Sequence, residues 1–217
     1  AIMVLLAKLT GGHRTIALLA MMYRWWSRLR KDLVSQWEDG FVGSWDTAVK
    51  GSSALRAAMS RAFQVEHAAL VGASAATLYW DIEKFYDSIS IDKLIPAAVE
   101  FGYPARMLHI TLTVHLAPRV LRMNGCMSDC VPPYTGLAPG CGRANTLARI
   151  VLYAVLDAAH ANAALRSALF SAQQFVDDVA TTVVGTARVV VQGLTAAVPF
   201  IRGMLSDLRL RVSEPKL

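Results

Sequence analysis

The chain alternates between two hydrophobic patterns. Short apolar and β-branched runs at 1–7, 77–80 and 179–184 predict strands, the first of them buried. Elsewhere apolar residues recur three or four positions apart, which predicts helices. These helices are expected at about residues 16–37, 53–70, 90–99, 104–115, 144–161 and 186–208. Strands and helices mixed in this way predict an α+β fold.

Three details of this pattern can be tested directly. One face of the first helix is apolar at helical spacing and is therefore expected to face the core. Its members are Leu19, Met22, Trp26, Leu29, Leu33 and Trp37. Ser52 or Ser53 is expected to cap the second helix, because a serine hydroxyl accepts a hydrogen bond from a free amide at a helix N-terminus. Asn124-Gly125, between two strand-like runs, predicts a two-residue hairpin.

Two of the predicted strands lead into acidic residues. Asp81 follows the strand 77–80, while Asp177 and Asp178 lie in a tight turn between Phe175-Val176 and the strand 179–184. These carboxylates converge if the strands lie side by side. Because like charges a few ångströms apart disfavour joint ionisation, such clusters usually hold divalent cations. Two cations on shared carboxylates are the apparatus of in-line phosphoryl transfer.

Composition narrows the class of protein. The 217 residues are 54% hydrophobic, enough for one large domain or two lobes with a shared core. A net charge of +6 suggests a polyanionic partner. No run of eighteen apolar residues is present, so no membrane span is expected. The start lacks an initiator methionine and a basic leader, so we expect no signal peptide there.

Cysteine usage points to a reducing compartment, such as the nucleus or cytoplasm. Cys126, Cys130 and Cys141 are odd in number, which argues against a disulfide framework. Their spacing with His115 fits no familiar zinc finger, so we interpret them as small residues around a hairpin and a loop.

Several stretches fall in an order that resembles a known family. Asp81 to Asp87 and Phe175 to Asp178 resemble the palm of a reverse transcriptase, most closely the branch of group II introns and non-LTR retroelements. Lys8 to Ile16 resembles the fingers segment that ends in Arg-Pro-Ile. Gly136 to Gly140 resembles the Gly-x-x-Gln-Gly loop before the palm helix. Leu208 to Val212, followed by Lys216, resembles the strand and lysine that close the palm.

The resemblance implies a right-hand polymerase fold. Residues 1–75 would form a fingers segment and residues 76–217 a palm, with an antiparallel palm sheet packed on helices. Together they would make one partial reverse transcriptase domain, and no stretch of the chain resembles a thumb.

The resemblance also implies an activity, which is retroelement-derived DNA synthesis on an RNA template. Its partners would be an RNA template, a DNA primer and deoxynucleoside triphosphates, with no membrane. Asp81 and Asp177 would bridge two Mg²⁺ ions, or Mn²⁺ in their place. Asp178 would assist, and the Ile82 carbonyl would add a further ligand.

Other residues are implied as substrate contacts. Lys8 and Arg14 would hold the triphosphate, and Lys216 would protonate the leaving group or steady the phosphates. Gly140 would let the backbone pass close to a bound base or sugar. Tyr86 would be the steric gate whose ring excludes a ribose 2′-hydroxyl, the group that separates RNA from DNA substrates.

The sequence departs from the family at two positions, and two other functions stay open. Pro139 stands where the family has Gln, which removes an amide side chain and a backbone donor, and Thr15 replaces the proline after Arg14. An RNA-dependent RNA polymerase would use the same metals. An inactive retroelement remnant with residual RNA binding is the other alternative.

Overall fold

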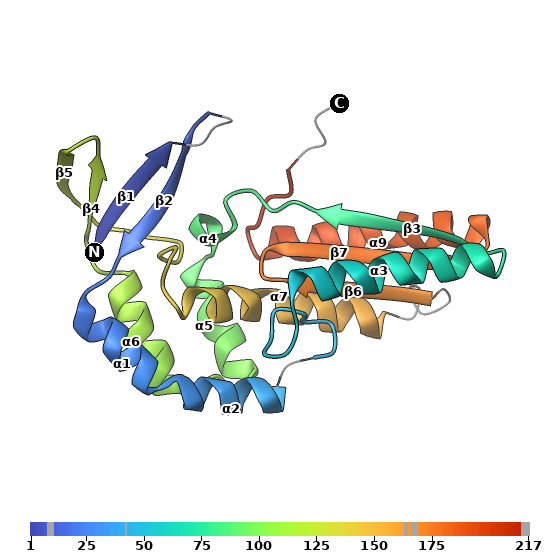
Figure 1. Cartoon of the computed structure of the whole chain (residues 1–217), viewed down its shortest axis with the longest axis horizontal. Helices are drawn as coiled ribbons and strands as arrows, with labels where there is room; N and C mark the ends of the chain where they lie inside the picture. Colours follow the sequence, from blue (N-terminus) through green and yellow to red (C-terminus); the bar gives the residue numbers. More distant parts are fainter. Residues whose placement is uncertain (8–10, 42, 163–164, 166–168, 214–217) are drawn as a thin grey trace. The chain divides into compact units, whose positions relative to one another are not determined.

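The computed structural model describes residues 1–7, 11–41, 43–162, 165 and 169–213. The chain forms two compact units, each assembled from two separate segments. Unit 1 contains Ala1–Phe41 and Tyr86–Ile150, and unit 2 contains Val42–Phe85 and Val151–Leu217 (Figure 1). Both strands and helices make up the fold, as the sequence predicted. The predicted division into fingers and palm at residue 75 concerns function and stays a prediction.

The sheet of unit 1 has the strand order β2-β1-β4-β5. β1 (Ile2–Ala7) pairs antiparallel with β2 (His13–Leu18) and parallel with β4 (Arg119–Met123). β4 pairs antiparallel with β5 (Cys126–Val131). The turn between them, Asn124-Gly125, has left-handed φ angles of 49° and 84°. Since a type I′ turn needs positive φ at both central residues, the predicted hairpin is confirmed.

The helices of unit 1 correct one prediction. α1 (Met21–Leu29) and α2 (Lys31–Phe41) replace the single helix expected at 16–37, because Ile16 to Leu18 pair with β1 instead. The helix also breaks at Arg30, so most of the predicted stripe does not face the core, and only Trp37 of its members is buried. Met22 and Leu29 are 75% and 77% exposed.

The face of α1 and α2 that is buried shares only Trp37 with the predicted stripe. Its other buried residues are Tyr23 on α1 and Val34 on α2. The Trp37 indole N–H donates to the carbonyl of Phe101, which follows α5 (Ile91–Glu100), at 2.6 Å. α6 (Ala105–His115) begins after Pro104, where the sequence predicted a helix start.

One helix, α7 (Ala144–Ala161), belongs to both units and is apolar on almost every side. Its buried residues include Leu147, Ile150, Val151, Leu152, Tyr153 and Leu156. A helix that is hydrophobic all round is a core helix. Two buried arginines lie at the unit 1 end of this helix. Arg143, just before its first residue, donates from Nε to Ser27 Oγ at 3.1 Å, and Arg149 forms an ion pair with Glu38. These hydrogen bonds and the ion pair compensate for the burial of the two charges.

Unit 2 is built on an antiparallel sheet with the order β3-β7-β6. β7 (Asp178–Gly185) lies between β3 (Ser74–Trp80) and β6 (Leu169–Phe175). Val179 of β7 pairs with Trp80 of β3 on one side and with Gln174 of β6 on the other. β6 and β7 form a hairpin, as predicted. Its two-residue loop is Val176-Asp177 and not the predicted Asp177-Asp178, because Asp178 pairs with Phe175 and begins β7.

Helices cover both faces of this sheet. α3 (Ala54–Leu70) packs on one face, where the Arg61 guanidinium lies 5.7 Å from the centre of the Tyr79 ring. α9 (Ala187–Asp207) packs on the other side (Figure 1). The antiparallel sheet packed on helices is therefore as the sequence predicted.

α9 is the one helix in the described part of the chain that could cross a membrane on length and composition. Its residues Val190, Gly193, Ala197, Ile201 and Leu205 recur three or four apart and are buried. With this one face the helix packs along β7 and β3, as an amphipathic helix on the surface of a globular unit does.

The N-cap of α3 gives a first test. The Ser53 side chain accepts a hydrogen bond from the Arg56 amide at 3.1 Å, so Ser53 and not Ser52 is the cap. We expect Ser53→Ala to lower the free energy of unfolding by about 1 kcal/mol. Denaturant unfolding would measure it, with Ser52→Ala as the matched control. An equal loss in both variants would contradict the cap assignment.

Candidate active site

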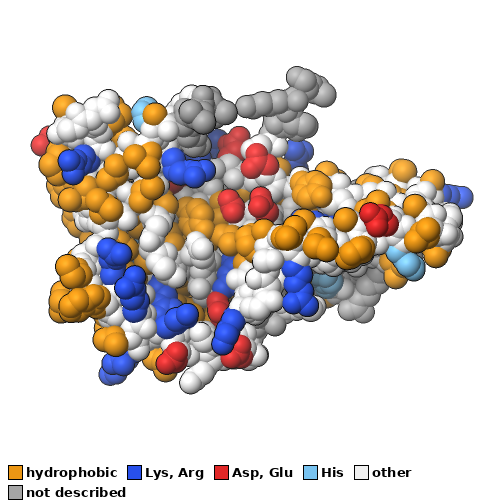
Figure 2. All heavy atoms as spheres, in the orientation of Figure 1, with side chains coloured by type: hydrophobic (Ala, Val, Ile, Leu, Met, Phe, Trp, Pro, Cys, Tyr) orange, Lys and Arg blue, Asp and Glu red, His pale blue; other side chains and the backbone are white. Residues whose placement is uncertain are grey.

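The three candidate carboxylates meet at one end of the sheet in unit 2. Because Trp80 pairs with Val179, Asp81 leaves β3 at the same end at which Asp178 begins β7. Asp177 sits in the adjoining hairpin loop. The convergence expected from the sequence therefore follows from strand register. Acidic side chains gather beside the end of β3 on the face seen in Figure 2.

The acids influence one another electrostatically. Partial burial raises the pKa of Asp177 above its usual value, and the charges of Asp178 and Asp81 raise it further. A backbone hydrogen bond opposes this rise. Among the described residues, no ion pair engages any of the three carboxylates. The site is thus a concentration of negative charge that a cation would stabilise.

A segment near the C-terminus fixes the backbone around Asp81. Ile82 forms an antiparallel bridge with Val212. The Ser213 amide donates to the Asp81 carbonyl at 2.7 Å, and the Glu83 amide donates to the Arg211 carbonyl at 2.9 Å. Successive residues of an extended strand direct their backbone groups to opposite edges. The Ile82 carbonyl is therefore directed away from residues 211–213.

The backbone next to the acids is strained at two positions. Val176 has φ of 59° and Lys84 has φ of 46°. A β-branched residue at positive φ is costly, because its Cβ crowds the following carbonyl. A two-residue hairpin loop with positive φ at its first position alone usually carries glycine there. Strain of this kind is concentrated at functional sites.

The remaining described candidates lie in unit 1. Arg14 is exposed on β2, opposite Leu6. Tyr86 is half-buried in α4 (Phe85–Ser88), and its hydroxyl donates to Asn145 Oδ1 at 2.5 Å. Gly140 has φ of 93° and lies against β2. Lys8 and Lys216 fall outside the described residues.

The glycine loop 136–142 packs against the backbone that carries Tyr86. A Cβ on Gly136 would lie 2.8 Å from the Asp87 carbonyl oxygen and 3.0 Å from that of Tyr86, so only glycine fits. The Leu137 amide donates to the Tyr86 carbonyl at 2.7 Å. Pro139 keeps a role despite its missing N–H, because its carbonyl accepts from the Ala17 amide at 2.8 Å.

His115 supports the same loop, a role that no motif in the sequence indicated. It is fully buried, and its Nδ1 accepts a long hydrogen bond of 3.4 Å from the Ala138 amide. Burial, with the nearby Arg119 charge, lowers the pKa of His115 to about 4. The imidazole is therefore neutral at physiological pH. From the sequence, we predicted only that His115 lies at the end of a helix.

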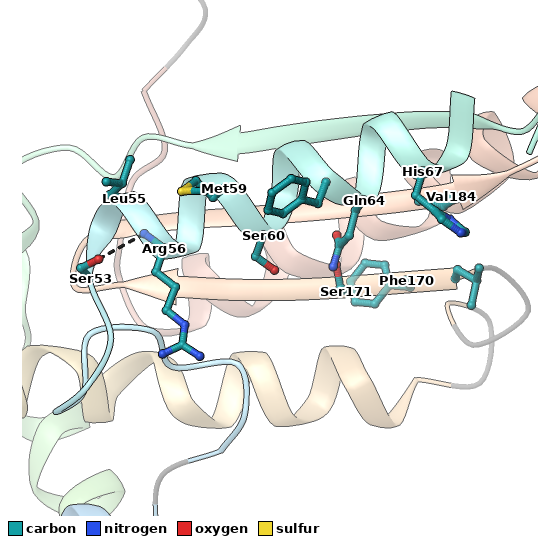
Figure 3. A pocket seen from close by; sticks show the side chains of 12 residues that line it. Ser53, Leu55, Arg56, Met59, Ser60, Gln64, His67, Phe170, Ser171 and Val184 are labelled. Atoms are coloured by element: carbon teal, nitrogen blue, oxygen red, sulfur yellow. Dashed lines mark hydrogen bonds between the residues drawn. The ribbon is translucent and has the colours of Figure 1, made fainter. Parts of the chain in front are cut away.

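A cavity of about 810 Å³ lies elsewhere in unit 2, between α3 and β6 (Figure 3). Met59, Phe63, Leu169 and Phe170 contribute apolar surface to it. No carboxylate is among the described residues that line it, so it is separate from the acidic end of the sheet.

Residues 6–217 match the family described as reverse transcriptase (RNA-dependent DNA polymerase). The chain belongs to the reverse transcriptase family. The resemblance read from the motifs is thereby confirmed over nearly the whole chain. No curated protein matches the sequence.

Solved telomerase structures share the fold. Apo telomerase from Candida tropicalis, truncated from its C-terminal domain, aligns with a TM-score of 0.59 and 9% identity over 95% of this chain and 48% of that chain. Candida tropicalis telomerase in complex with the TWJ fragment of telomeric RNA gives 0.65 and 10%, over 97% and 39%. The corresponding Candida albicans complex gives 0.62 and 11%, over 99% and 43%. This chain therefore spans less than half the length of each.

Reverse transcriptases generally use divalent metal ions, and the donor atoms at the acidic end of the sheet suit such ions. Carboxylate and carbonyl oxygens are the ligands that Mg²⁺ prefers. Asp81 and Asp178 act on the pKa of Asp177, so the three share one electrostatic environment. In the described part of the chain no three acidic, histidine or cysteine side chains are already spaced to hold one ion. The donor chemistry of these residues fits a divalent cation.

The buried His115 predicts a pH dependence of stability. Its pKa is about 4 in the folded chain and about 6.5 when unfolded, so below pH 6.5 only the unfolded chain takes up the proton. Its contribution to stability is lost as pH falls from 6.5 towards 4. We expect the free energy of unfolding to drop by about 2 kcal/mol between pH 7 and pH 5. His115→Gln should lose this drop, whereas the exposed His109→Gln should keep it; an unchanged drop in His115→Gln would contradict the assignment.

The strained hairpin predicts an unusual stabilising substitution. Val176→Gly removes a Cβ from a left-handed position, and we expect the free energy of unfolding to rise by about 0.5–1 kcal/mol. Val71→Gly is the control, because Val71 is exposed and has φ of −93°, where glycine brings only an entropic cost. Denaturant unfolding of both variants would measure the difference. A loss of stability in Val176→Gly as large as in the control would show that position 176 is unstrained.

Proposed function

We propose that the chain catalyses template-directed DNA synthesis on RNA, by nucleotidyl transfer from deoxynucleoside triphosphates to a DNA primer. The observation that carries this proposal is the meeting of Asp81, Asp177 and Asp178 at one end of the β3–β7 pair, in a chain of the reverse transcriptase family. The RNA-bound telomerases with a similar fold support an RNA partner. The motifs favour a retroelement origin, near group II introns and non-LTR elements.

The carboxylates would bind two divalent cations, Mg²⁺ or Mn²⁺. Asp81 and Asp177 would bridge them, with Asp178 and the Ile82 carbonyl as further ligands. When bound, the ions would lower the pKa of the primer 3′-hydroxyl and neutralise charge on the triphosphate. The negative charges of the three carboxylates repel one another, and each bound cation would reduce this repulsion.

Cationic side chains would complete the charge balance during transfer. Arg14 projects from β2 into solvent and can bind phosphate, while Lys8 and Lys216 are assigned from the motifs alone. Residues 1–75 would act as fingers and residues 76–217 as palm. Gly140, at positive φ, would allow close approach of a base or sugar.

The presence of tyrosine at position 86 favours synthesis of DNA over synthesis of RNA. Its ring would occupy the space of a ribose 2′-hydroxyl, so deoxynucleotides would be preferred. Proline at position 139 is compatible with activity, because its carbonyl still accepts a hydrogen bond from the Ala17 amide and so holds the glycine loop in place.

Primer extension tests the proposal. With Mg²⁺, an RNA template and a DNA primer, we expect the chain to extend with deoxynucleotides. Asp177→Asn should reduce extension at least about 1000-fold, because it removes the charge that holds the cations. Glu66→Gln is the matched control, since it removes an exposed carboxylate from α3 of the same unit.

The circular dichroism spectrum of each variant would confirm that it is folded. Equal extension by wild type and Asp177→Asn would remove the metal assignment. A folded wild type without any extension would favour the inactive remnant, and extension with ribonucleotides alone would favour an RNA polymerase.

A further inference from the structure

Tyr86 is held at both ends by residues of unit 1. At the backbone, its carbonyl accepts from the Leu137 amide at 2.7 Å, and the Cα of Gly136 packs directly beside it. At the other end, its hydroxyl donates to Asn145 Oδ1 at 2.5 Å. A tyrosine side chain has two torsions. With the backbone and the hydroxyl both held, the ring has a single position.

Asn145 can hold the hydroxyl because its own helix is rigidly anchored. It lies in the first turn of α7. Arg143, two residues earlier, donates to the side chain and the carbonyl of Ser27 on α1. Arg149, one turn later, pairs with Glu38 on α2, and both arginine side chains are buried. These two fixed points leave Asn145 little freedom to move with the tyrosine.

We propose that Asn145 is the positioning residue that sets sugar discrimination through Tyr86. The inference rests on the proposed function, in which the Tyr86 ring faces the nucleotide sugar. A ring held only at its Cα could rotate away from a 2′-hydroxyl, and exclusion would weaken. A ring tied to the anchored α7 cannot rotate without breaking a hydrogen bond. Asn145 itself need not touch the substrate.

Asn145→Leu tests this directly, since leucine has a similar volume but offers no polar atom. The measurement is the ratio of kcat/KM for a deoxynucleotide to that for the matching ribonucleotide. We expect Asn145→Leu to lower this ratio by about 3- to 10-fold, the range for losing one hydrogen bond. Asn145→Asp keeps an oxygen acceptor and should restore most of the ratio. Its added charge affects both nucleotides alike, because both carry the same triphosphate.

A double-mutant cycle separates this role from general damage to α7. Tyr86→Phe removes the hydroxyl, so in that background Asn145→Leu should not lower the ratio further. Gln36→Leu is the control for loss of an exposed amide, because Gln36 is exposed on α2, and it should leave the ratio unchanged.

The outcomes distinguish this inference from the proposed function. No extension by folded wild type would overturn the proposed function, and the inference with it. Extension with an unchanged ratio in Asn145→Leu would overturn the inference alone. An equal fall of the ratio in the wild-type and Tyr86→Phe backgrounds would also overturn it, since the effect would then bypass the hydroxyl.

Discussion

The register of β3 against β7 is the constraint on which the acidic site depends. Two side-chain hydrogen bonds fix it across the strands. The buried Trp80 indole N–H donates to Thr181 Oγ1 at 3.2 Å, and the hydroxyls of Thr77 and Thr182 lie 2.9 Å apart. A slip of one residue would break both bonds and turn every β7 side chain to the opposite face. It would also move Asp178 out of line with Asp81. An unpaired indole N–H in the core is costly, so the interior of the sheet determines the position of the carboxylates at its end.

The glycine loop of unit 1 is positioned by close packing of one backbone segment against another. Gly136 allows the glycine loop to lie against Tyr86 and Asp87 where no larger residue fits. His115 and Ala17 then hold Ala138 and Pro139, the next residues of the loop. Substituting proline for the family's glutamine therefore leaves the path of the loop intact, because the loop is fixed by carbonyls and by neighbouring amides.

Sequence patterns correctly predicted the elements that depend on residues close together in the chain. The hairpin at Asn124-Gly125 and the helix at 144–161 needed only turn chemistry and periodicity. The acidic hairpin was also predicted, but its loop lies one residue earlier than expected, at Val176-Asp177. The helix expected at 16–37 was wrong, because pairing of Ile16 to Leu18 with β1 overrode its helical pattern. Convergence of the three acids was predicted from strand ends and motif order. Asn145 was missed because its contact with Tyr86 joins residues 59 apart in the chain, and no spacing rule connects them.

The central claim is that Asp81, Asp177 and Asp178 bind the same cations. Ferrous iron in place of Mg²⁺, with hydrogen peroxide and ascorbate, tests it most directly, because the bound iron reduces the peroxide to hydroxyl radicals that cut the backbone next to it. The account predicts cuts beside Asp81-Ile82 and beside Asp177-Asp178 in one chain, suppressed by excess Mg²⁺. Both sets of cuts should disappear together in Asp81→Asn. Cutting at only one of the two segments, or cuts at Asp177 that persist in Asp81→Asn, would contradict a shared metal site.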